Sequence, residues 1–183
     1  FFCTYCIVPH VRGEPRSMPL ADVREEARRL AGTGFQEVVL TGIHLGLYGR
    51  ELDQNVDLAA AVRLVREVGG IQRVRLSSLE ATEVTGDLVE AMQHPAVCPH
   101  LHLPLQSGDD GVLERMGRRY TSGEFAEAVR RVRAELEEPA ISADVLVGFP
   151  GETDAQFENT LQFCREVGFS RMHVFTYSPR SGT

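Results

Sequence analysis

The sequence predicts an α/β domain built on parallel strands, because short apolar strand patterns alternate with amphipathic helix patterns along the chain. Breaker residues separate these segments at regular intervals, and strands divided by helices pair in parallel through right-handed crossovers. The chain has 183 residues, enough for one domain with a substantial core. Two architectures satisfy this pattern: an open doubly wound sheet and part of a (β/α) barrel.

The first half of the chain shows two repeats of helix followed by strand. A helix is expected to open at Ser17, with Pro19 in its first turn, and a second is expected to open at Asp57. Glycines end both helices, and the strands expected after them are 37–41 and 73–77.

The second half contains three further helices and three strands. A short helix is expected from Thr85, and two longer helices open at capping boxes, in which Thr is followed three residues later by Glu or Gln. These boxes are Thr121 with Glu124 and Thr153 with Gln156. On the last helix one face is expected to carry Phe157, Leu161 and Cys164. The remaining strands are expected at 100–105, 141–147 and 172–175.

In both architectures ligands bind beyond the carboxyl ends of the strands. Chemistry is therefore expected in the segments that follow the strands, namely 41–48, 77–80, 105–110, 148–152 and 177–179. The alternation also predicts a first strand, which would lie upstream of Phe1.

The charge balance restricts the function classes. Formal net charge is −7, with 26 acidic and 19 basic residues, which argues against this segment alone gripping nucleic acid through its phosphates. No apolar run approaches the length of a membrane helix, and no basic, apolar leader precedes Cys3. We expect a cytoplasmic location with reduced thiols and no membrane partner.

Cys3 and Cys6 form a C-x-x-C pair, a spacing at which thiolates hold metals or perform redox chemistry. A loop is expected after the pair, unlike the helix of a thioredoxin-type motif, and a zinc site would require a second pair. Cys98 and Cys164 are isolated and are expected to be structural. On spacing alone, metal ligation and an incidental thiol pair both remain open.

Several longer motifs extend the pattern around this pair. They are Phe2-Cys3-Thr4-Tyr5-Cys6-Ile7-Val8-Pro9, Leu76-Ser77-Ser78-Leu79-Glu80, His102-Leu103-Pro104-Leu105-Gln106-Ser107-Gly108, Met116-x-Arg118-x-Tyr120-Thr121, the segment from Asp144 to Thr153, and Tyr177-Ser178-Pro179-Arg180-x-Gly182-Thr183. In this order and over nearly the whole chain, they resemble the radical S-adenosylmethionine (SAM) methylthiotransferases, whose cluster loop is C-x-x-x-C-x-x-C.

The resemblance implies that residues 1–183 are the radical SAM core, a partial (β/α) barrel whose first strand is missing. Cys3 and Cys6 would be two of three thiolate ligands of a 4Fe–4S cluster that cleaves SAM, with the third ligand upstream. Complete relatives also carry an N-terminal domain with a second 4Fe–4S cluster and a C-terminal TRAM domain. The implied partners are the tRNA anticodon loop, in the full-length protein, and an electron donor of unknown identity.

The segments 41–49 and 98–102 look most like the MtaB branch, which places a methylthio group at C2 of N6-threonylcarbamoyladenosine beside the anticodon. The branch acting on isopentenyladenosine usually has Gly-Gln-Asn where this chain has Gly42-Ile43-His44. The alternatives are therefore isopentenyladenosine in tRNA, an aspartate of a ribosomal protein or, in another class, a non-enzymatic metal- or redox-binding module.

Carried over position by position, the resemblance implies eight residues near SAM. They are Tyr5, Thr41, Gly42, Ser77, Glu80, Gln106, Arg118 and Gly148. Tyr5 would lie near the adenine, Thr41 and Gly42 near the methionine amino group, and the Arg118 fork suits the methionine carboxylate.

Each of these assignments has a purely structural alternative. Tyr5 can pack the loop, Gly42 and Gly148 can serve tight turns, Glu80 can cap, and Arg118 can belong to a solvated charged face. His100 and His102 are expected to be neighbours on one strand face, packed and not ligands. A further expectation is that Asp109-Asp110 caps a helix.

Overall fold

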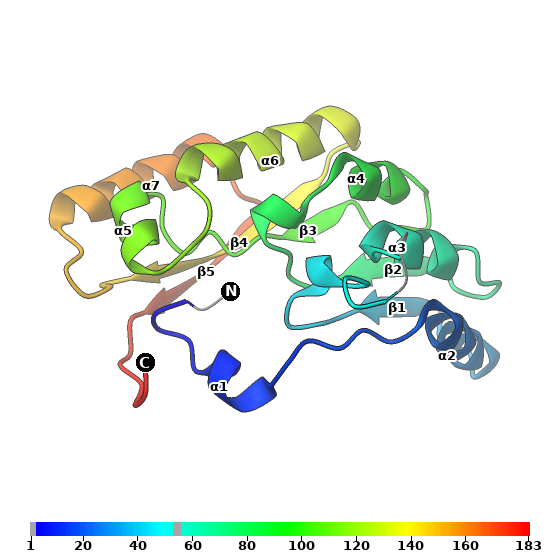
Figure 1. Cartoon of the computed structure of the whole chain (residues 1–183). Coiled ribbons are helices and arrows are strands. Elements are labelled where there is room, and N and C mark those ends of the chain that lie inside the picture. The colour runs from blue at the N-terminus through cyan, green and yellow to red at the C-terminus, as the bar shows by residue number, and fades with distance from the viewer. Residues whose placement is uncertain (1–2, 53–55) are drawn as a thin grey trace.

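The computed structural model describes residues 3–52 and 56–183, which form an α/β domain of parallel strands (Figure 1). The strands are β1 (Glu37–Leu40), β2 (Arg73–Leu76), β3 (His100–His102), β4 (Ala140–Val147) and β5 (Arg171–Thr176). The helices are α1 (Val8–Arg12), α2 (Leu20–Gly32), α3 (Leu58–Arg66), α4 (Gly86–Met92), α5 (Asp110–Arg115), α6 (Ser122–Glu135) and α7 (Asp154–Val167). Two 3₁₀ turns, η1 (Leu45–Leu47) and η2 (Ala81–Glu83), follow β1 and β2.

The strand order identifies the architecture. β1 pairs with β2, and β4 pairs with both β3 and β5, always in parallel. The two groups meet at Val74 of β2, whose N–H donates to the Ala96 carbonyl at 2.7 Å and whose carbonyl accepts from the Cys98 N–H at 2.9 Å. The strands therefore follow one another in chain order without reversal, which is the arrangement of part of a barrel and not of a doubly wound sheet.

The two faces of the strands differ in polarity. On β4 the buried, helix-facing residues are Ile141, Ala143 and Val145, and they join a core centred on the fully buried Phe125 of α6. Their neighbours Ser142 and Asp144 alternate with them and project to the other face. Figure 1 shows α6 and α7 along one side of the strands and α1 with the N-terminal segment on the other. On β4, the face opposite α6 and α7 therefore carries the polar Ser142 and Asp144, followed by the partly buried Leu146.

Most expected helix starts are confirmed, including the caps at Asp57, Thr85, Thr121 and Thr153. The expected start at Ser17 is wrong, because the helix begins at Leu20. The Ser17 hydroxyl instead accepts from the Gly49 N–H at 3.0 Å and donates to Glu51 at 3.1 Å. A long-range contact thus replaces the cap.

Three other expectations are corrected. The loop expected after Cys6 contains the short helix α1, which tolerates proline near its start. The strand expected at 100–105 ends at His102, just before Pro104, which has no N–H to donate. Phe157 is exposed, because the buried stripe of α7 begins one turn later, at Thr160, and continues through Cys164 and Val167.

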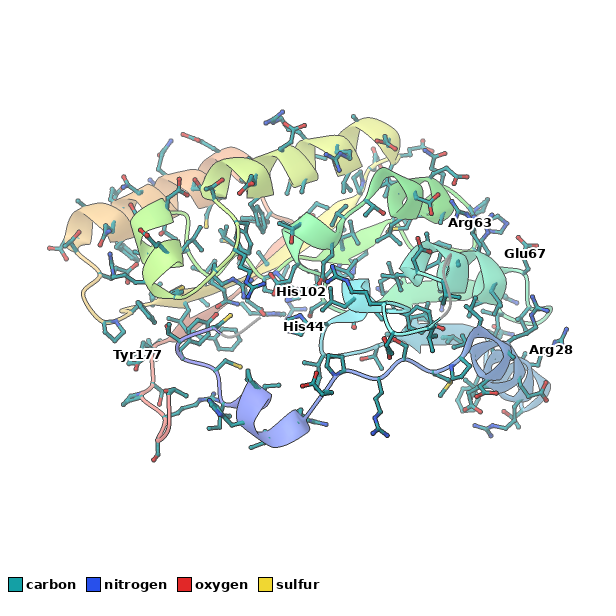
Figure 2. All side chains as sticks on the ribbon, viewed as in Figure 1. Arg28, His44, Arg63, Glu67, His102 and Tyr177 are labelled. Atoms are coloured by element: carbon teal, nitrogen blue, oxygen red, sulfur yellow. The ribbon has the colours of Figure 1, made fainter. Side chains whose placement is uncertain are left out.

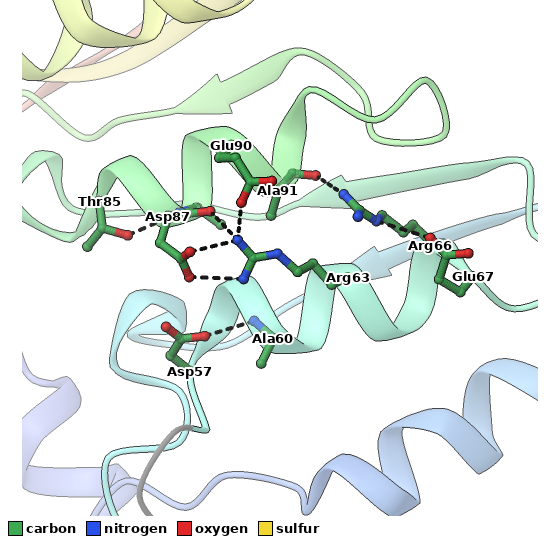
Figure 3. A network of polar contacts seen from close by, with 10 residues as sticks. Asp57, Ala60, Arg63, Arg66, Glu67, Thr85, Asp87, Glu90 and Ala91 are labelled. Carbon is green, nitrogen blue, oxygen red and sulfur yellow. Dashed lines mark hydrogen bonds and ion pairs between the residues drawn. The ribbon is translucent and has the colours of Figure 1, made fainter.

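A polar network joins α3 to α4 (Figure 3). The guanidinium of Arg63 binds the Asp87 carboxylate in a fork, with N–O distances of 2.7 and 3.0 Å, and also pairs with Glu90. Arg66, one turn later, donates to the Ala91 carbonyl at 2.9 Å. Across the described ranges, no helix is both long and apolar enough to cross a membrane.

Replacing Arg63 with alanine is expected to lower the free energy of unfolding by about 1 kcal/mol, because it removes a forked pair between two helices at a partly exposed site. Urea unfolding measures this change, and added salt should reduce the difference. Arg130→Ala is the matched control, since Arg130 pairs with Glu127 on the exposed side of a single helix. Equal losses in both variants would contradict a role for the network in joining the helices.

Candidate functional site

The segments that follow the strands meet at one edge of the sheet. Ser77, directly after β2, donates its N–H to the Leu40 carbonyl at the end of β1 at 2.9 Å. Leu79 donates its N–H to the His102 carbonyl at the end of β3 at 3.0 Å. These bonds tie segment 77–80 to both neighbouring strands, so the side chains that leave this edge are held on rigid elements.

Arg118 and Glu80 form a buried ion pair at this edge. Their side chains are only 4% and 11% exposed. The same guanidinium donates to the Tyr120 hydroxyl at 2.8 Å and to the Pro104 carbonyl at 3.1 Å. Arg118 therefore joins the segments after β2 and β3, and the expectation of a solvated charged face does not describe it.

Burial controls the electrostatics of this cluster. It raises the pKa of Glu80, an effect that Arg118 partly opposes. It also raises the pKa values of Tyr5 and Tyr120. Burial alone would lower the pKa of Arg118, but Tyr120 and Glu80 outweigh it, and that pKa is raised. Arg118 is thus a permanent cation at this edge.

The cysteine loop is anchored beside this pair. The Arg118 guanidinium donates to the Cys3 sulfur at 3.4 Å. The Cys6 N–H donates to the Cys3 carbonyl at 3.0 Å, which closes a turn between the two thiols. Thr4 is bonded through its N–H to the Met116 carbonyl at 3.0 Å and through its hydroxyl to the Arg115 carbonyl at 2.9 Å. Both thiols are free and half-buried.

Aromatic rings link the loop to the last two strands. Tyr5 packs edge-on against Phe149, which follows β4, with ring centroids 6.1 Å apart. Phe149 packs in the same way against Tyr177, which follows β5, at 5.6 Å; Tyr177 is labelled in Figure 2. The packing role considered for Tyr5 is therefore present, and its contact with an adenine stays a prediction.

The two glycines predicted to line the site, Gly148 and Gly42, differ in whether their backbone conformation requires glycine. Gly148 has φ of +73°, a conformation that favours glycine. Its N–H donates to the Glu152 carboxylate at 2.6 Å, so it serves a tight turn. Gly42 is not among the glycines with positive φ, and a Cβ there would meet Leu45 at an ordinary 3.5 Å. A turn requirement does not explain Gly42.

Two polar residues at this edge have unusual environments. The Ser77 hydroxyl oxygen is buried and has no hydrogen-bond partner among the described residues. Gln106 has φ of +64°, which is uncommon for a residue with a side chain. Its N–H and carbonyl bond to β4 through Asp144 and Leu146. Such unsatisfied or strained groups cluster where ligands bind.

The site therefore brings together some predicted residues and leaves others nearby. Direct contacts join Cys3, Glu80 and Arg118, while Thr41, Gly42, Ser77, Gln106 and Gly148 follow the strands at the same edge. Sequence reasoning missed Tyr120, although it stands two residues after Arg118 in the same motif. Two free thiols in one turn and an orphan Ser77 hydroxyl are features that a metal–sulfur cluster with a polar co-substrate would satisfy.

Comparisons with known proteins agree with this geometry. The Radical SAM superfamily model matches residues 1–164. The chain is 43% identical over 183 residues to the threonylcarbamoyladenosine tRNA methylthiotransferase MtaB of Thermotoga maritima, covering 99% of this chain and 42% of that protein. It is 39% identical over 183 residues to the tRNA-2-methylthio-N(6)-dimethylallyladenosine synthase of Clostridium tetani, covering 100% of this chain and 40% of that protein.

The fold comparison points the same way. The radical S-adenosylmethionine methyltransferase TsrM of Kitasatospora setae, solved with cobalamin and a 4Fe–4S cluster, superposes with a TM-score of 0.77. The match covers 95% of this chain and 34% of that one at 16% identity, so it bears on the fold alone. This chain spans about two fifths of the length of the curated relatives it matches. With the family model matching most of its length, the chain belongs to the radical SAM superfamily.

Proposed function

We propose that this chain is the radical SAM core of a tRNA methylthiotransferase that places a methylthio group at C2 of N6-threonylcarbamoyladenosine. The observation that carries the proposal is the 43% identity over 99% of the chain to the Thermotoga maritima protein named for that activity. The Gly42-Ile43-His44 segment after β1 supports the same branch. In this proposal residues 1–183 are the core domain of a longer cytoplasmic enzyme.

Superfamily membership implies a 4Fe–4S cluster and SAM. In the proposal, Cys3 and Cys6 supply two of the cluster ligands, and the third ligand and a second cluster lie outside this chain. When bound, the cluster supplies the electron that cleaves SAM. In the proposal, the remaining partners of the complete enzyme are an electron donor and the anticodon loop of tRNA.

The chain's own residues then position and shield the reactants. Arg118 holds the Cys3 sulfur and the Glu80 carboxylate in a fixed relation. The Tyr5–Phe149–Tyr177 rings pack against one another along one side of the loop. The Ser77 hydroxyl, which has no hydrogen-bond partner within residues 3–52 and 56–183, is available to bind a polar group of SAM. The exposed Thr41, Gly42 and Gly148, with the half-buried Gln106, complete the edge on which SAM would bind.

A second candidate keeps this chemistry and changes the nucleoside. The Clostridium tetani relative is named for dimethylallyladenosine and matches the same 183 residues at 39% identity. The substrate is therefore the part of the proposal that most needs a direct test.

Mass spectrometry of tRNA nucleosides from a strain lacking the complete gene tests the substrate. Loss of methylthio-threonylcarbamoyladenosine, with accumulation of its precursor, is expected. Restoration by the wild-type gene, and not by one carrying Cys3→Ala, would assign the loss to this site. Loss of the methylthio-dimethylallyl nucleoside instead would favour the second candidate, and an unchanged tRNA profile would contradict both and direct attention to ribosomal protein.

A further inference from the structure

A group of potential metal ligands lies on the polar face of the strands, apart from the cysteine loop. His102, Asp144 and His173 come from the neighbouring strands β3, β4 and β5. His102 Nε2 is 3.1 Å from one carboxylate oxygen of Asp144, and His173 Nδ1 is 3.2 Å from the other. Figure 2 shows His102 in the central part of the molecule.

The spacing matches the coordination sphere of a divalent transition metal. One donor atom from each residue can be chosen so that all three lie within 4.8 Å of one another. Bonds of roughly 2.1 Å place neighbouring donor atoms about 3.0 Å apart in octahedral and about 3.4 Å apart in tetrahedral geometry. The separations of 3.1 and 3.2 Å fall in this interval, one for each oxygen of Asp144, so a bidentate carboxylate would meet both histidines at these distances.

A hydrogen-bonded residue already supports one of these ligands from behind. The second ring nitrogen of His102, Nδ1, is 2.9 Å from the Ser142 hydroxyl, which is itself 3.1 Å from His100 Nε2. With Nε2 on a metal, Nδ1–H would donate to Ser142, whose hydroxyl would donate to His100. Such a bond fixes the orientation of a ligating histidine and raises its basicity. Ser142 is buried, so the support is rigid.

Access to the three ligands increases from β3 to β5. Their side chains are 14%, 24% and 44% exposed for His102, Asp144 and His173, respectively. An ion held between them would keep positions open on the β5 side. Three protein ligands with open positions are typical of catalytic metal centres, and two histidines with one carboxylate suit iron, cobalt or zinc.

We propose that His102, Asp144 and His173 bind one divalent first-row transition-metal ion on the inner face of β3, β4 and β5. This site shares no residue with the cysteine loop or with the Glu80–Arg118 pair, so it does not depend on the proposed function. It also changes the interpretation of His102, which the sequence suggested was only a packed strand residue.

Cobalt titration of this chain carrying Cys3→Ala and Cys6→Ala tests the proposal, because those substitutions remove the competing thiol pair. One equivalent of Co²⁺ should bind, with visible d–d absorption and no thiolate charge-transfer band, and Zn²⁺ should displace it. In that background His173→Ala and Asp144→Asn should each weaken binding at least ~100-fold, and Ser142→Ala by roughly 10–100-fold. His10→Ala, which removes an exposed histidine outside the group, should leave binding unchanged.

Three results would overturn the metal site. They are no binding of Co²⁺ or Zn²⁺ at micromolar concentrations, affinity in the His173 and Asp144 variants that equals that of the parent protein, and a thiolate band that places the ion on another cysteine. His173 lies on an exposed edge strand, so His173→Gln should keep the fold while it removes the ligand. Far-UV circular dichroism and urea unfolding of each variant would exclude unfolding as the cause of lost binding.

Discussion

Replacing Cys3 with alanine in the complete protein is expected to abolish formation of 5′-deoxyadenosine from SAM. A site-differentiated 4Fe–4S cluster needs all of its thiolate ligands, and alanine offers no donor atom. Cys3 also receives the Arg118 hydrogen bond at 3.4 Å, so its loss separates the cysteine loop from the ion pair behind it. Cys6→Ala should have the same effect, because the two cysteines close one turn.

Anaerobic reconstitution followed by chromatography of the products measures this effect directly. Iron and labile sulfide should fall by the content of one cluster and not to zero, because the proposed function places a second cluster outside this chain. Cys98→Ala is the matched control. Cys98 is also a free, half-buried cysteine, but its N–H donates to Val74 of β2 and it lies outside the cysteine loop, so SAM cleavage should persist. Retained 5′-deoxyadenosine formation by the Cys3 variant would remove Cys3 from the ligand set.

Local sequence signals predicted the helix starts well. Asp57, Thr85, Thr121 and Thr153 each accept from an N–H within the next turn, an interaction that depends only on nearby residues. Ser17 has the same residue type but is bonded to residues more than thirty positions away. Local chemistry is therefore sufficient until a tertiary partner competes for the same side chain.

The strand order could not be decided from the residues alone. Both a doubly wound sheet and a barrel produce alternating strands and helices, and they differ in which strands are neighbours. That choice depends on long-range backbone pairing, such as the parallel bridge between Val74 and Val97. Resemblance to a known family favoured the barrel, and the observed order of β1 to β5 confirms it.

The site was predicted as a set of positions and not as a set of contacts. Strand ends correctly placed Glu80 and Arg118 at one edge, but the sequence did not predict that they pair with each other. The group of His102, Asp144 and His173 was missed because its members lie far apart in the sequence. A usable signal was present, since each puts a titratable side chain on a strand otherwise rich in apolar residues.

Replacing Arg118 with alanine is expected to cost about 3–5 kcal/mol of unfolding free energy, because it leaves the buried Glu80 carboxylate without its cation. Glu80 would then take up a proton on folding more readily, since burial already raises its pKa from 4.5 and Arg118 opposes that rise. A carboxyl group whose pKa is raised in the folded state favours folding at low pH, and this contribution to the free energy of unfolding is lost as the pH rises through that pKa. The deficit of the variant should therefore be larger at pH 8 than at pH 5 in urea unfolding.

A double-mutant cycle isolates the ion pair from the rest of the cluster. Glu80→Gln removes the stranded charge, so Arg118→Ala combined with Glu80→Gln should recover part of the lost stability and most of the pH dependence. Arg119→Ala, at the adjacent exposed position, should change stability by less than about 1 kcal/mol. A pH-independent loss in Arg118→Ala would show that packing against Tyr120 and Pro104, and not the charge, is what Arg118 contributes.

The same variant separates two roles of Arg118 in the complete protein. If its guanidinium takes part in the cofactor site, affinity for SAM should fall more than cluster content, because the thiolates remain in place. Arg118→Lys keeps the charge but lacks the planar fork, whose Nε donates to Tyr120, whose Nη1 donates to Cys3 and whose Nη2 donates to Glu80. Compared with Arg118→Ala, the lysine variant should recover part of the lost stability and a smaller part of the lost SAM affinity. Unchanged affinity in Arg118→Ala would leave Arg118 as a structural cation that only holds the Glu80 segment and the cysteine loop together.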